Sequence, residues 1–129
     1  MVEKQLLINF ILESNQIEWE VRINPWDIEA MQYVLDNWFN TTKDFKKVHR
    51  ILWKYLKQER TGKRRCVQVT VWNHTPPHCN IVWYKMEELV ENLDKMNSWE
   101  AHNEFVNIHP FQDLNGRVGR LLWLAKAIE

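Results

Sequence analysis

The sequence has little glycine, proline or cysteine, and it carries no net charge. Its 129 residues include three glycines and four prolines, which is too few for a disordered chain or a glycine-rich scaffold. Two cysteines, Cys66 and Cys79, do not make a disulfide framework. A net charge of zero removes any global electrostatic reason to bind nucleic acid or an anionic membrane. We therefore expect one globular domain with neither nucleic acid nor membrane as a partner.

The sequence also lacks a long apolar run. No stretch approaches the roughly 20 apolar residues that cross a bilayer. The short apolar stretch near the start is broken by Asn9, and Glu3 and the absence of a small-residue cleavage site argue against a signal peptide. Cytoplasmic localisation is the resulting expectation, and the sequence does not distinguish action in the cell of origin from delivery into another cell.

Six segments show the three- and four-residue spacing of apolar side chains that predicts amphipathic helices. Most of the eight tryptophans fall on or near these apolar stripes, so we expect them in the core. The predicted fold class is therefore all-α, a helical bundle. The predicted helices cover residues 3–18, 28–38, 41–60, 82–96, 98–109 and 116–128. Two of them have predicted N-caps, Thr41 with Asp44 three residues on, and Ser98. The Asn24-Pro25 pair is predicted to interrupt the chain before the second helix.

One segment follows a different pattern. Residues 66–71 alternate and are rich in β-branched side chains, which predicts a short strand. A turn at residues 73–77 follows it, with Pro76 and Pro77 adjacent. We therefore expect one small β-hairpin inserted in the bundle, with Trp72 at the end of its strand.

A polar loop, residues 113–116, separates the last two predicted helices. It ends at a helix N-terminus, where unpaired N–H groups and the helix dipole favour an anion. His109 can act as a neutral base at physiological pH. Asp113 supplies a hard oxygen ligand that suits Mg²⁺. The loop therefore has the chemistry of a phosphate site.

The first turn of the last helix strengthens this interpretation. Arg117 and Arg120 lie one turn apart, and the planar guanidinium binds phosphate oxygens with two hydrogen bonds at once. Asn115 and Gly116 can present backbone N–H groups to the same oxygens.

The string from His109 to Arg120 resembles the Fic family motif, H-P-F-x-[D/E]-G-N-G-R-x-x-R, and eight of its nine specified positions match. Upstream, the Gly62–Arg65 stretch and the alternating strand resemble the flap of that family, a hairpin that holds the target segment. The resemblance implies a single Fic domain over residues 1–129. Its catalytic core would span residues 41–129, with the flap near 63–77 and the motif at 109–120.

The resemblance implies a protein adenylyltransferase that moves AMP from ATP to a Ser, Thr or Tyr hydroxyl of a target protein. His109 would deprotonate the hydroxyl, and Asp113 would hold Mg²⁺ against the phosphates. The flap would bind the target main chain by strand addition. The phosphate-binding residues would be Asn115, Gly116, Arg117 and Arg120, and the flap residues Val67, Val69 and Val71.

A second resemblance lies in the first predicted helix. Ser14 to Glu18 resembles the inhibitory motif [S/T]-x-x-x-E-[G/N], with Trp19 in place of the last residue. The resemblance implies that residues 1–20 form an inhibitory helix. Glu18 would pair with Arg120 and take the place of the γ-phosphate, since a carboxylate and a phosphate compete for one guanidinium.

Leu114 departs from the motif, which has glycine at this position. Glycine reaches positive φ without strain, whereas another residue in the left-handed region costs roughly 1–2 kcal/mol. Two alternatives therefore stay open beside the transferase. One is a degenerate Fic domain that binds nucleotide or peptide without catalysis. The other is a Fic enzyme that removes AMP or transfers another phosphate-containing group. The target protein, the modified residue and the formation of homo-oligomers also stay open.

The other histidines and cysteines have plainer interpretations. His49 lies between Val48 and Arg50 on an apolar stripe, and we expect it to be partly buried with a structural role. The spacings among His74, His78 and the two cysteines do not follow common zinc patterns.

Overall fold

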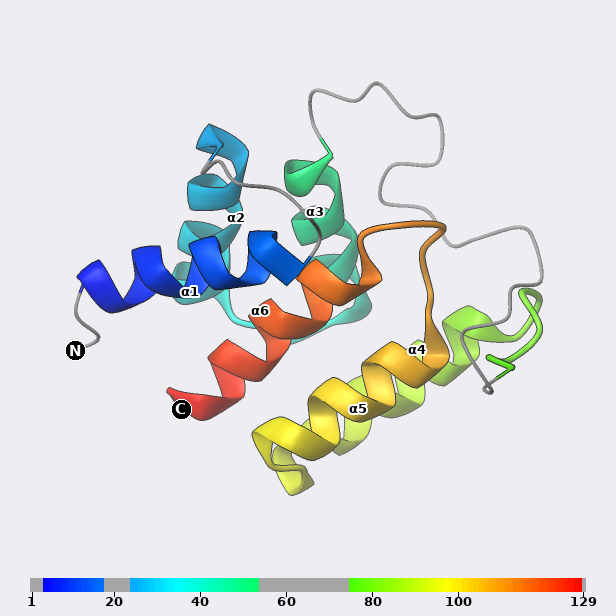
Figure 1. Ribbon diagram of the computed structural model, residues 1–129. Helices are drawn as coiled ribbons and strands as arrows, with labels where there is room; N and C mark the ends of the chain where they lie inside the picture. Colours follow the sequence, from blue (N-terminus) through cyan, green and yellow to red (C-terminus); the bar gives the residue numbers. More distant parts are fainter. Residues whose placement is uncertain (1–3, 18–23, 54–74, 129) are drawn as a thin grey trace.

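The computed structural model describes residues 4–17, 24–53 and 75–128 (Figure 1). These ranges are helical and contain no strand, which confirms the all-α class. The predicted strand at residues 66–71 lies outside them. The elements are α1 (Lys4–Ile17), α2 (Pro25–Asn37), α3 (Thr42–Leu52), α4 (Val82–Asn92), the 3-10 turn η1 (Leu93–Lys95), α5 (Ser98–Ile108) and α6 (Asn115–Ala127).

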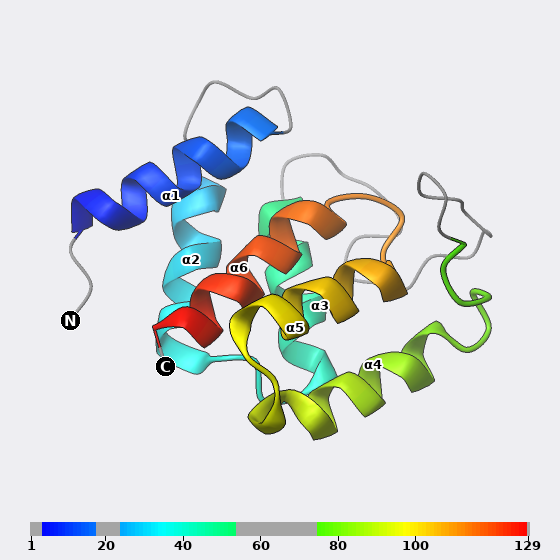
Figure 2. The same ribbon diagram turned by 60° about the horizontal axis from the view of Figure 1, so that its bottom comes forward.

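Helices α5 and α6 form the centre of the bundle. They lie side by side and run in opposite directions, joined at one end by a loop of residues 109–114 (Figures 1 and 2). Helix α4 packs along α5, while α1 and α2 lie against α6. Helix α3 packs on α2 and also touches α4 and α6. Helix α3 therefore contacts α6, the helix that begins where this loop ends.

Helix α2 begins three residues earlier than the predicted helix. Asn24 is its N-cap, and the Asp27 carboxylate accepts a hydrogen bond of 2.9 Å from the Asn24 N–H. Pro25 is the first helical residue, a position where its missing N–H costs nothing because that group has no partner inside a helix. The Asn24–Pro25 pair starts the helix, whereas the sequence suggested an interruption.

Two other helix starts test the predicted caps. At α3, Thr41 is the N-cap and its N–H donates to the Asp44 carboxylate at 2.9 Å, as predicted. At α5 the prediction of Ser98 as the cap is wrong by one residue. Asn97 is the cap, and its side-chain oxygen accepts a hydrogen bond of 2.8 Å from the Glu100 N–H.

The core is built around aromatic rings and one close helix contact. Phe45 of α3 stacks between Phe39, at 4.4 Å between ring centroids, and Phe105 of α5, at 5.4 Å. On α6, Gly119 lets α5 approach closely, because an added Cβ would lie 3.2 Å from side-chain atoms of Phe105 and Val106.

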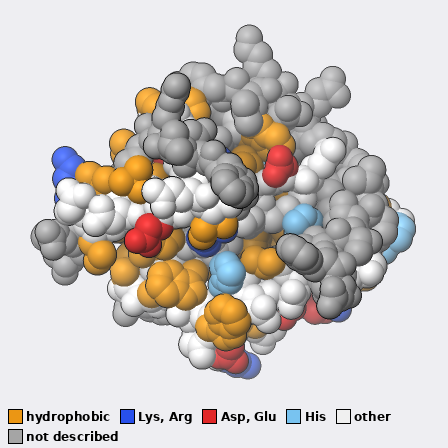
Figure 3. Space-filling model, in the orientation of Figure 1, with side chains coloured by type: hydrophobic (Ala, Val, Ile, Leu, Met, Phe, Trp, Pro, Cys, Tyr) orange, Lys and Arg blue, Asp and Glu red, His pale blue; other side chains and the backbone are white. Residues whose placement is uncertain are grey.

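Two tryptophans contradict the expectation of a core position. Trp99 is 65% exposed and Trp123 is 38% exposed, whereas Trp53 is buried. Figure 3 shows apolar side chains gathered around one histidine on this face of the molecule, over α1, α5 and α6. Within the described ranges, no helix is long and apolar enough to cross a membrane.

Candidate active site

A polar hollow of about 490 Å³ opens at the loop between α5 and α6. The residues predicted to carry phosphate chemistry meet here, with the exception of Arg120. The hollow is lined by His109, Gln112, Asp113, Leu114, Asn115, Gly116 and Arg117.

The loop starts where α5 ends. His109 is the C-cap of α5 and has a left-handed backbone, with φ 51° and ψ 60°. Pro110 and Phe111 follow it and are both buried. A buried aromatic ring directly after the cap fastens the loop to the core, so His109 stays at the rim of the hollow.

Asn115 closes the loop with its side chain. Its Oδ1 accepts a hydrogen bond of 2.9 Å from the Phe111 N–H, and its Nδ2 donates to the Phe111 carbonyl at 2.8 Å. Asn115 is only 3% exposed. The side chain is therefore committed to the loop, and only the backbone N–H of Asn115 is left for the predicted phosphate contact.

Leu114 adopts the backbone conformation for which glycine is the usual choice. It is the N-cap of α6, with φ 67° and ψ 11°, and its side chain is partly buried against the core. No side chain in the described part of the chain caps α6. The amides of its first turn, at Asn115, Gly116 and Arg117, are thus the unpaired donors that make a helix start attractive to anions.

Arg117 adds positive charge beside these amides. Its Nε is buried and has no hydrogen-bond partner within the described residues. A buried guanidinium nitrogen without a partner is costly, and an anion in the hollow would remove that cost. This orphaned donor fits the predicted role of Arg117 as a phosphate ligand.

Arg120 lies one turn further along α6 and contacts α1. Its Nε donates to the Ser14 hydroxyl at 2.8 Å, and its Nη2 donates to the Ser14 carbonyl at 3.2 Å. The structure therefore brings the first residue of the predicted inhibitory motif to the second motif arginine. Glu18, which was predicted to pair with Arg120, lies outside the described residues.

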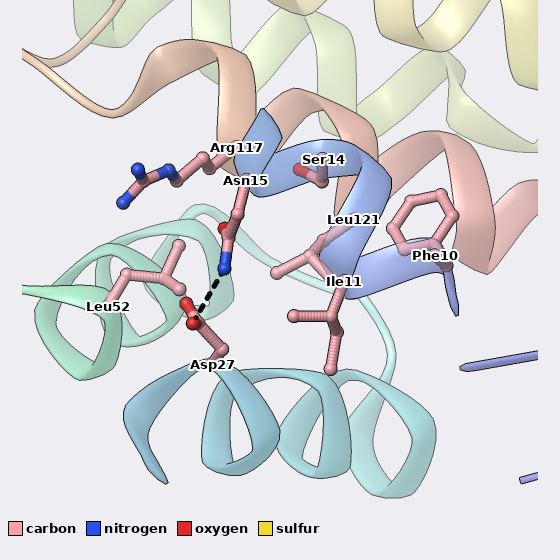
Figure 4. Close-up of a pocket in the computed structure, with 8 residues that line it drawn as sticks. All are labelled: Phe10, Ile11, Ser14, Asn15, Asp27, Leu52, Arg117 and Leu121. Carbon is pink, nitrogen blue, oxygen red and sulfur yellow. Dashed lines mark hydrogen bonds between the residues drawn. The ribbon is translucent and has the colours of Figure 1, made fainter. Parts of the chain in front are cut away.

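Helix α1 is also fastened to α2 through a buried polar pair. Asn15 Nδ2 donates to the Asp27 carboxylate at 3.0 Å, and both residues are less than 5% exposed. Figure 4 shows this bond bridging the two helices, with Arg117 above it and its guanidinium directed away from Ser14. The contacts at Ser14 and Asn15 together hold the end of α1 over α6.

Asp113 is the predicted magnesium ligand, and its side chain is exposed at the hollow. One carboxylate oxygen accepts a hydrogen bond of 2.7 Å from the Leu114 N–H. Among the described residues, no three His, Cys, Asp or Glu side chains gather closely enough to hold a metal ion by themselves. Mg²⁺ commonly binds one or two carboxylates plus substrate phosphates, so a single carboxylate beside an anion site fits it. The flap residues Val67, Val69 and Val71 lie beyond the described ranges.

His49 contributes to the site although the sequence did not predict this. It is fully buried on α3, and its Nε2 lies 3.1 Å from the Asp113 carbonyl oxygen. Burial lowers the pKa of His49 from 6.5 to about 4, so the ring is neutral at physiological pH. Its place four residues after Phe45, on the apolar stripe of α3, is a signal that could have predicted full burial but not the contact with Asp113.

Comparisons with known proteins identify the family of this chain. Residues 38–125 match the model of the Fic/DOC family. The chain is 34% identical over 107 residues to a protein adenylyltransferase Fic of Culex quinquefasciatus and 33% identical over 107 residues to one of Aedes aegypti. Each match covers 72% of this chain and 21% of the relative, so the chain spans about a fifth of those proteins.

The fold is similar to a solved structure as well. A crystal structure of a Fic family protein from Desulfovibrio desulfuricans G20 superposes with a TM-score of 0.70 at 25% sequence identity. The superposition covers 94% of this chain and 46% of the other.

Proposed function

The chain belongs to the Fic/DOC family, and we propose that it transfers AMP from ATP to a hydroxyl group of a target protein. The observation that supports this most directly is the polar hollow between α5 and α6. It combines a histidine and a carboxylate with a guanidinium nitrogen and a helix start that have no side-chain partner among the described residues. The relatives named as protein adenylyltransferases support the same reaction class.

In the proposed reaction the target hydroxyl loses its proton to His109, and its oxygen attacks the α-phosphorus of ATP. The bond from that phosphorus to the bridging oxygen breaks, pyrophosphate leaves, and AMP stays on the target. A positioned base contributes typically 10²–10⁴-fold to such a step. Fixed donors around the phosphates supply the other main contribution, because charge develops on the phosphate oxygens.

The remaining loop residues bind and orient the nucleotide. The backbone N–H groups of Asn115 and Gly116 and the guanidinium of Arg117 would bind the phosphates. Asp113 would hold Mg²⁺, which neutralises phosphate charge when it is bound.

Helix α1 is proposed to restrain the reaction. Arg120 would bind the γ-phosphate, and its guanidinium is already engaged by Ser14 of α1. Glu18 would add a carboxylate that competes with the phosphate for the same arginine. The chain as it stands would therefore bind ATP in an unproductive way.

The test is transfer of label from ATP that carries a radioactive α-phosphate, with Mg²⁺ and a cell lysate as the source of targets. Wild type, Glu18→Gly and Glu18→Gly/His109→Ala are compared on a gel. We expect label with Glu18→Gly, much less with wild type and none with the double variant. Absence of label from all three folded proteins would rule out the transferase.

Leu114 favours one second candidate, a domain that binds nucleotide without transferring AMP. Leu114 lines the hollow at the position where the motif has glycine, so the residue adds bulk close to the helix start that the phosphates must approach. Binding of ATP by Glu18→Gly in calorimetry, without label transfer, would support this candidate.

A further inference from the structure

One peptide group of the anion-binding loop is held at both ends. This group joins Asp113 to Leu114. Its carbonyl oxygen lies 3.1 Å from Nε2 of His49, and its N–H donates to the Asp113 carboxylate at 2.7 Å. A carbonyl oxygen has no proton to give, so the imidazole carries the proton on Nε2 and donates it. The partner of the carbonyl comes from α3, 64 residues away along the chain.

His49 is itself fixed by its surroundings. The side chain is 0% exposed, and the ring stacks on Phe111 at 4.0 Å between centroids, with 15° between the planes. Trp53 meets the same ring edge-on at 5.2 Å. A ring packed in this way points its Nε2 in one direction. Since Phe111 belongs to the loop, His49 supports the loop at two points.

The peptide held by His49 controls the start of α6. Leu114 follows it with φ 67°, a conformation that a residue with a Cβ disfavours. Rotation of the Asp113–Leu114 peptide would change that φ and would break both hydrogen bonds. The same rotation would move the Asp113 carboxylate and the first amides of α6, which are the groups that face the hollow.

We infer that His49 is a positioning residue for this site: its hydrogen bond to the Asp113 carbonyl oxygen keeps Leu114 left-handed and so holds the loop in its anion-binding form. What the loop binds rests on the proposed function. The role of His49 in holding Leu114 left-handed depends only on its hydrogen bond to Asp113 and on the packing of its ring.

The first experiment uses the unchanged chain. Long-range ¹H–¹⁵N NMR correlations of the imidazole identify which nitrogen carries the proton. We expect the proton on Nε2 of His49. A neutral ring protonated only on Nδ1 would place two lone pairs face to face and would overturn the inference.

The second experiment uses two variants of His49 in the Glu18→Gly chain. Glutamine places its amide Nε2 near the position of the imidazole Nε2 and can donate, whereas phenylalanine keeps a stacked ring without a donor. Affinity for ATP with Mg²⁺ is measured by calorimetry, and kcat and KM by label transfer. We expect His49→Phe to lose about tenfold in kcat/KM and His49→Gln to recover most of it, since the loss of one such bond is a tenfold effect in order of magnitude.

Val48→Ala is the matched control, because Val48 is also fully buried on α3 and its side chain has no hydrogen-bond donor. It should lower the melting temperature without a comparable loss of affinity. A purely structural role for His49 would lower the melting temperature in both His49 variants without a difference between them in kcat/KM. That result would overturn the inference.

The inference and the proposed function fail in different ways. If Glu18→Gly neither binds ATP nor transfers label, the proposed function fails. His49 is then judged by the ¹³Cα and ¹³Cβ shifts of Leu114, which report its backbone conformation. We expect a left-handed signature in the Glu18→Gly parent and in His49→Gln that is lost in His49→Phe. An unchanged signature in His49→Phe would overturn the inference. If His49→Phe does not fold, two results test the role of His49. They are the tautomer of His49 in the unchanged chain and the left-handed signature of Leu114 in His49→Gln, and the absence of either expected result would overturn the inference.

Discussion

The guanidinium of Arg120 donates two hydrogen bonds to Ser14, one to its hydroxyl at 2.8 Å and one to its carbonyl at 3.2 Å. The two residues are 106 positions apart in the chain. Arg120 is the arginine that would bind the γ-phosphate of ATP, and Ser14 belongs to the helix proposed as a brake. A phosphate that reaches Arg120 must therefore compete with α1 for the same donors.

Ser14→Ala is expected to weaken this brake without removing it. The variant loses the hydroxyl acceptor and keeps the carbonyl, and a hydrogen bond to a charged group is worth about 1.5–3 kcal/mol. We expect label transfer to rise several-fold above wild type and to stay below that of Glu18→Gly. Ser98→Ala is the control, since Ser98 lies at the start of α5 beside the cap residue Asn97. Equal labelling by both serine variants and wild type would contradict the prediction.

Asp27→Ala is expected to detach the end of α1 from α2. The Asp27 carboxylate accepts from Asn15 Nδ2 and from the Asn24 N–H, and loss of buried hydrogen bonds of this kind costs about 1–3 kcal/mol. The midpoint of urea unfolding should fall, and label transfer should rise because α1 no longer holds Arg120 in place.

The control for Asp27 is Asp36→Ala on the same helix, whose carboxylate accepts only an exposed bond from Gln32 in the described part of the chain. We expect its stability to stay within about 0.5 kcal/mol of wild type. A fall in stability for Asp27→Ala with no gain in label transfer would show that the hydrogen bond between Asn15 and Asp27 stabilises the fold but does not contribute to inhibition.

The features that depend on residues close together in the sequence were predictable. Apolar spacing located each described helix, and the Thr41–Asp44 pair marked the start of α3. The consecutive residues of the motif also predicted a polar loop with an anion site at a helix start, and the structure has a polar hollow at that loop. The start of α2 was misplaced because Pro25 can interrupt a chain or open a helix, and only the capping by Asp27 decides between them.

The contacts between distant elements were not predictable from local patterns. His49 reaches Asp113 only because α3 packs beneath the loop. Trp99 and Trp123 lie beside the apolar stripes of α5 and α6, not on them, and both are exposed. The face of a helix that packs on the core holds residues three or four apart, so an aromatic residue near such a stripe can still face solvent.

Gly119→Val is expected to force α5 and α6 apart. A Cβ added at this position would lie 3.2 Å from side-chain atoms of Phe105 and Val106, and overpacking a core costs typically about 1–3 kcal/mol. Alanine gains about 1 kcal/mol of helix propensity over glycine, which offsets much of its smaller crowding. We therefore expect Gly119→Ala to unfold near the wild-type urea concentration and Gly119→Val well below it. Equal midpoints for the two variants would show that the helices separate freely.

His102 should titrate below its usual range. Burial disfavours the charged imidazolium and lowers the pKa of His102 below 6.5, and the nearby Arg120 guanidinium lowers it further. As the pH falls through 6.5, the unfolded chain binds this proton before the folded chain does, so stability decreases with falling pH. Replacing His102 by glutamine should reduce the loss of stability between pH 7 and pH 5.

The contribution of Arg120 to this shift can be measured separately. In Arg120→Gln the pKa of His102, followed by NMR titration of its ring protons, should rise and should stay below 6.5, because burial is the larger cause. A pKa that does not move would show that the guanidinium charge is screened from the ring.

Leu114→Gly is expected to improve ATP binding with little change in stability. Glycine removes the cost of about 1–2 kcal/mol for a left-handed leucine. Glycine also removes a partly buried side chain and raises the entropy of the unfolded chain, and both changes destabilise the fold. Together they are comparable to the free energy gained by relieving the strain. These effects nearly cancel in the folding free energy. In the hollow, however, the Leu114 side chain is gone and phosphates can approach the backbone.

Leu114→Asn distinguishes the two reasons for such a gain. Asparagine tolerates the left-handed region but keeps a side chain. If calorimetry with ATP and Mg²⁺ shows tighter binding for glycine alone, close approach of the phosphates limits the natural chain. Tighter binding for both variants would identify the backbone strain of Leu114 as the limit, because relief of strain is what they share. Unchanged affinity in both would mean that leucine at this position leaves ATP binding intact, and a failure to transfer AMP would then have to arise elsewhere in the chain.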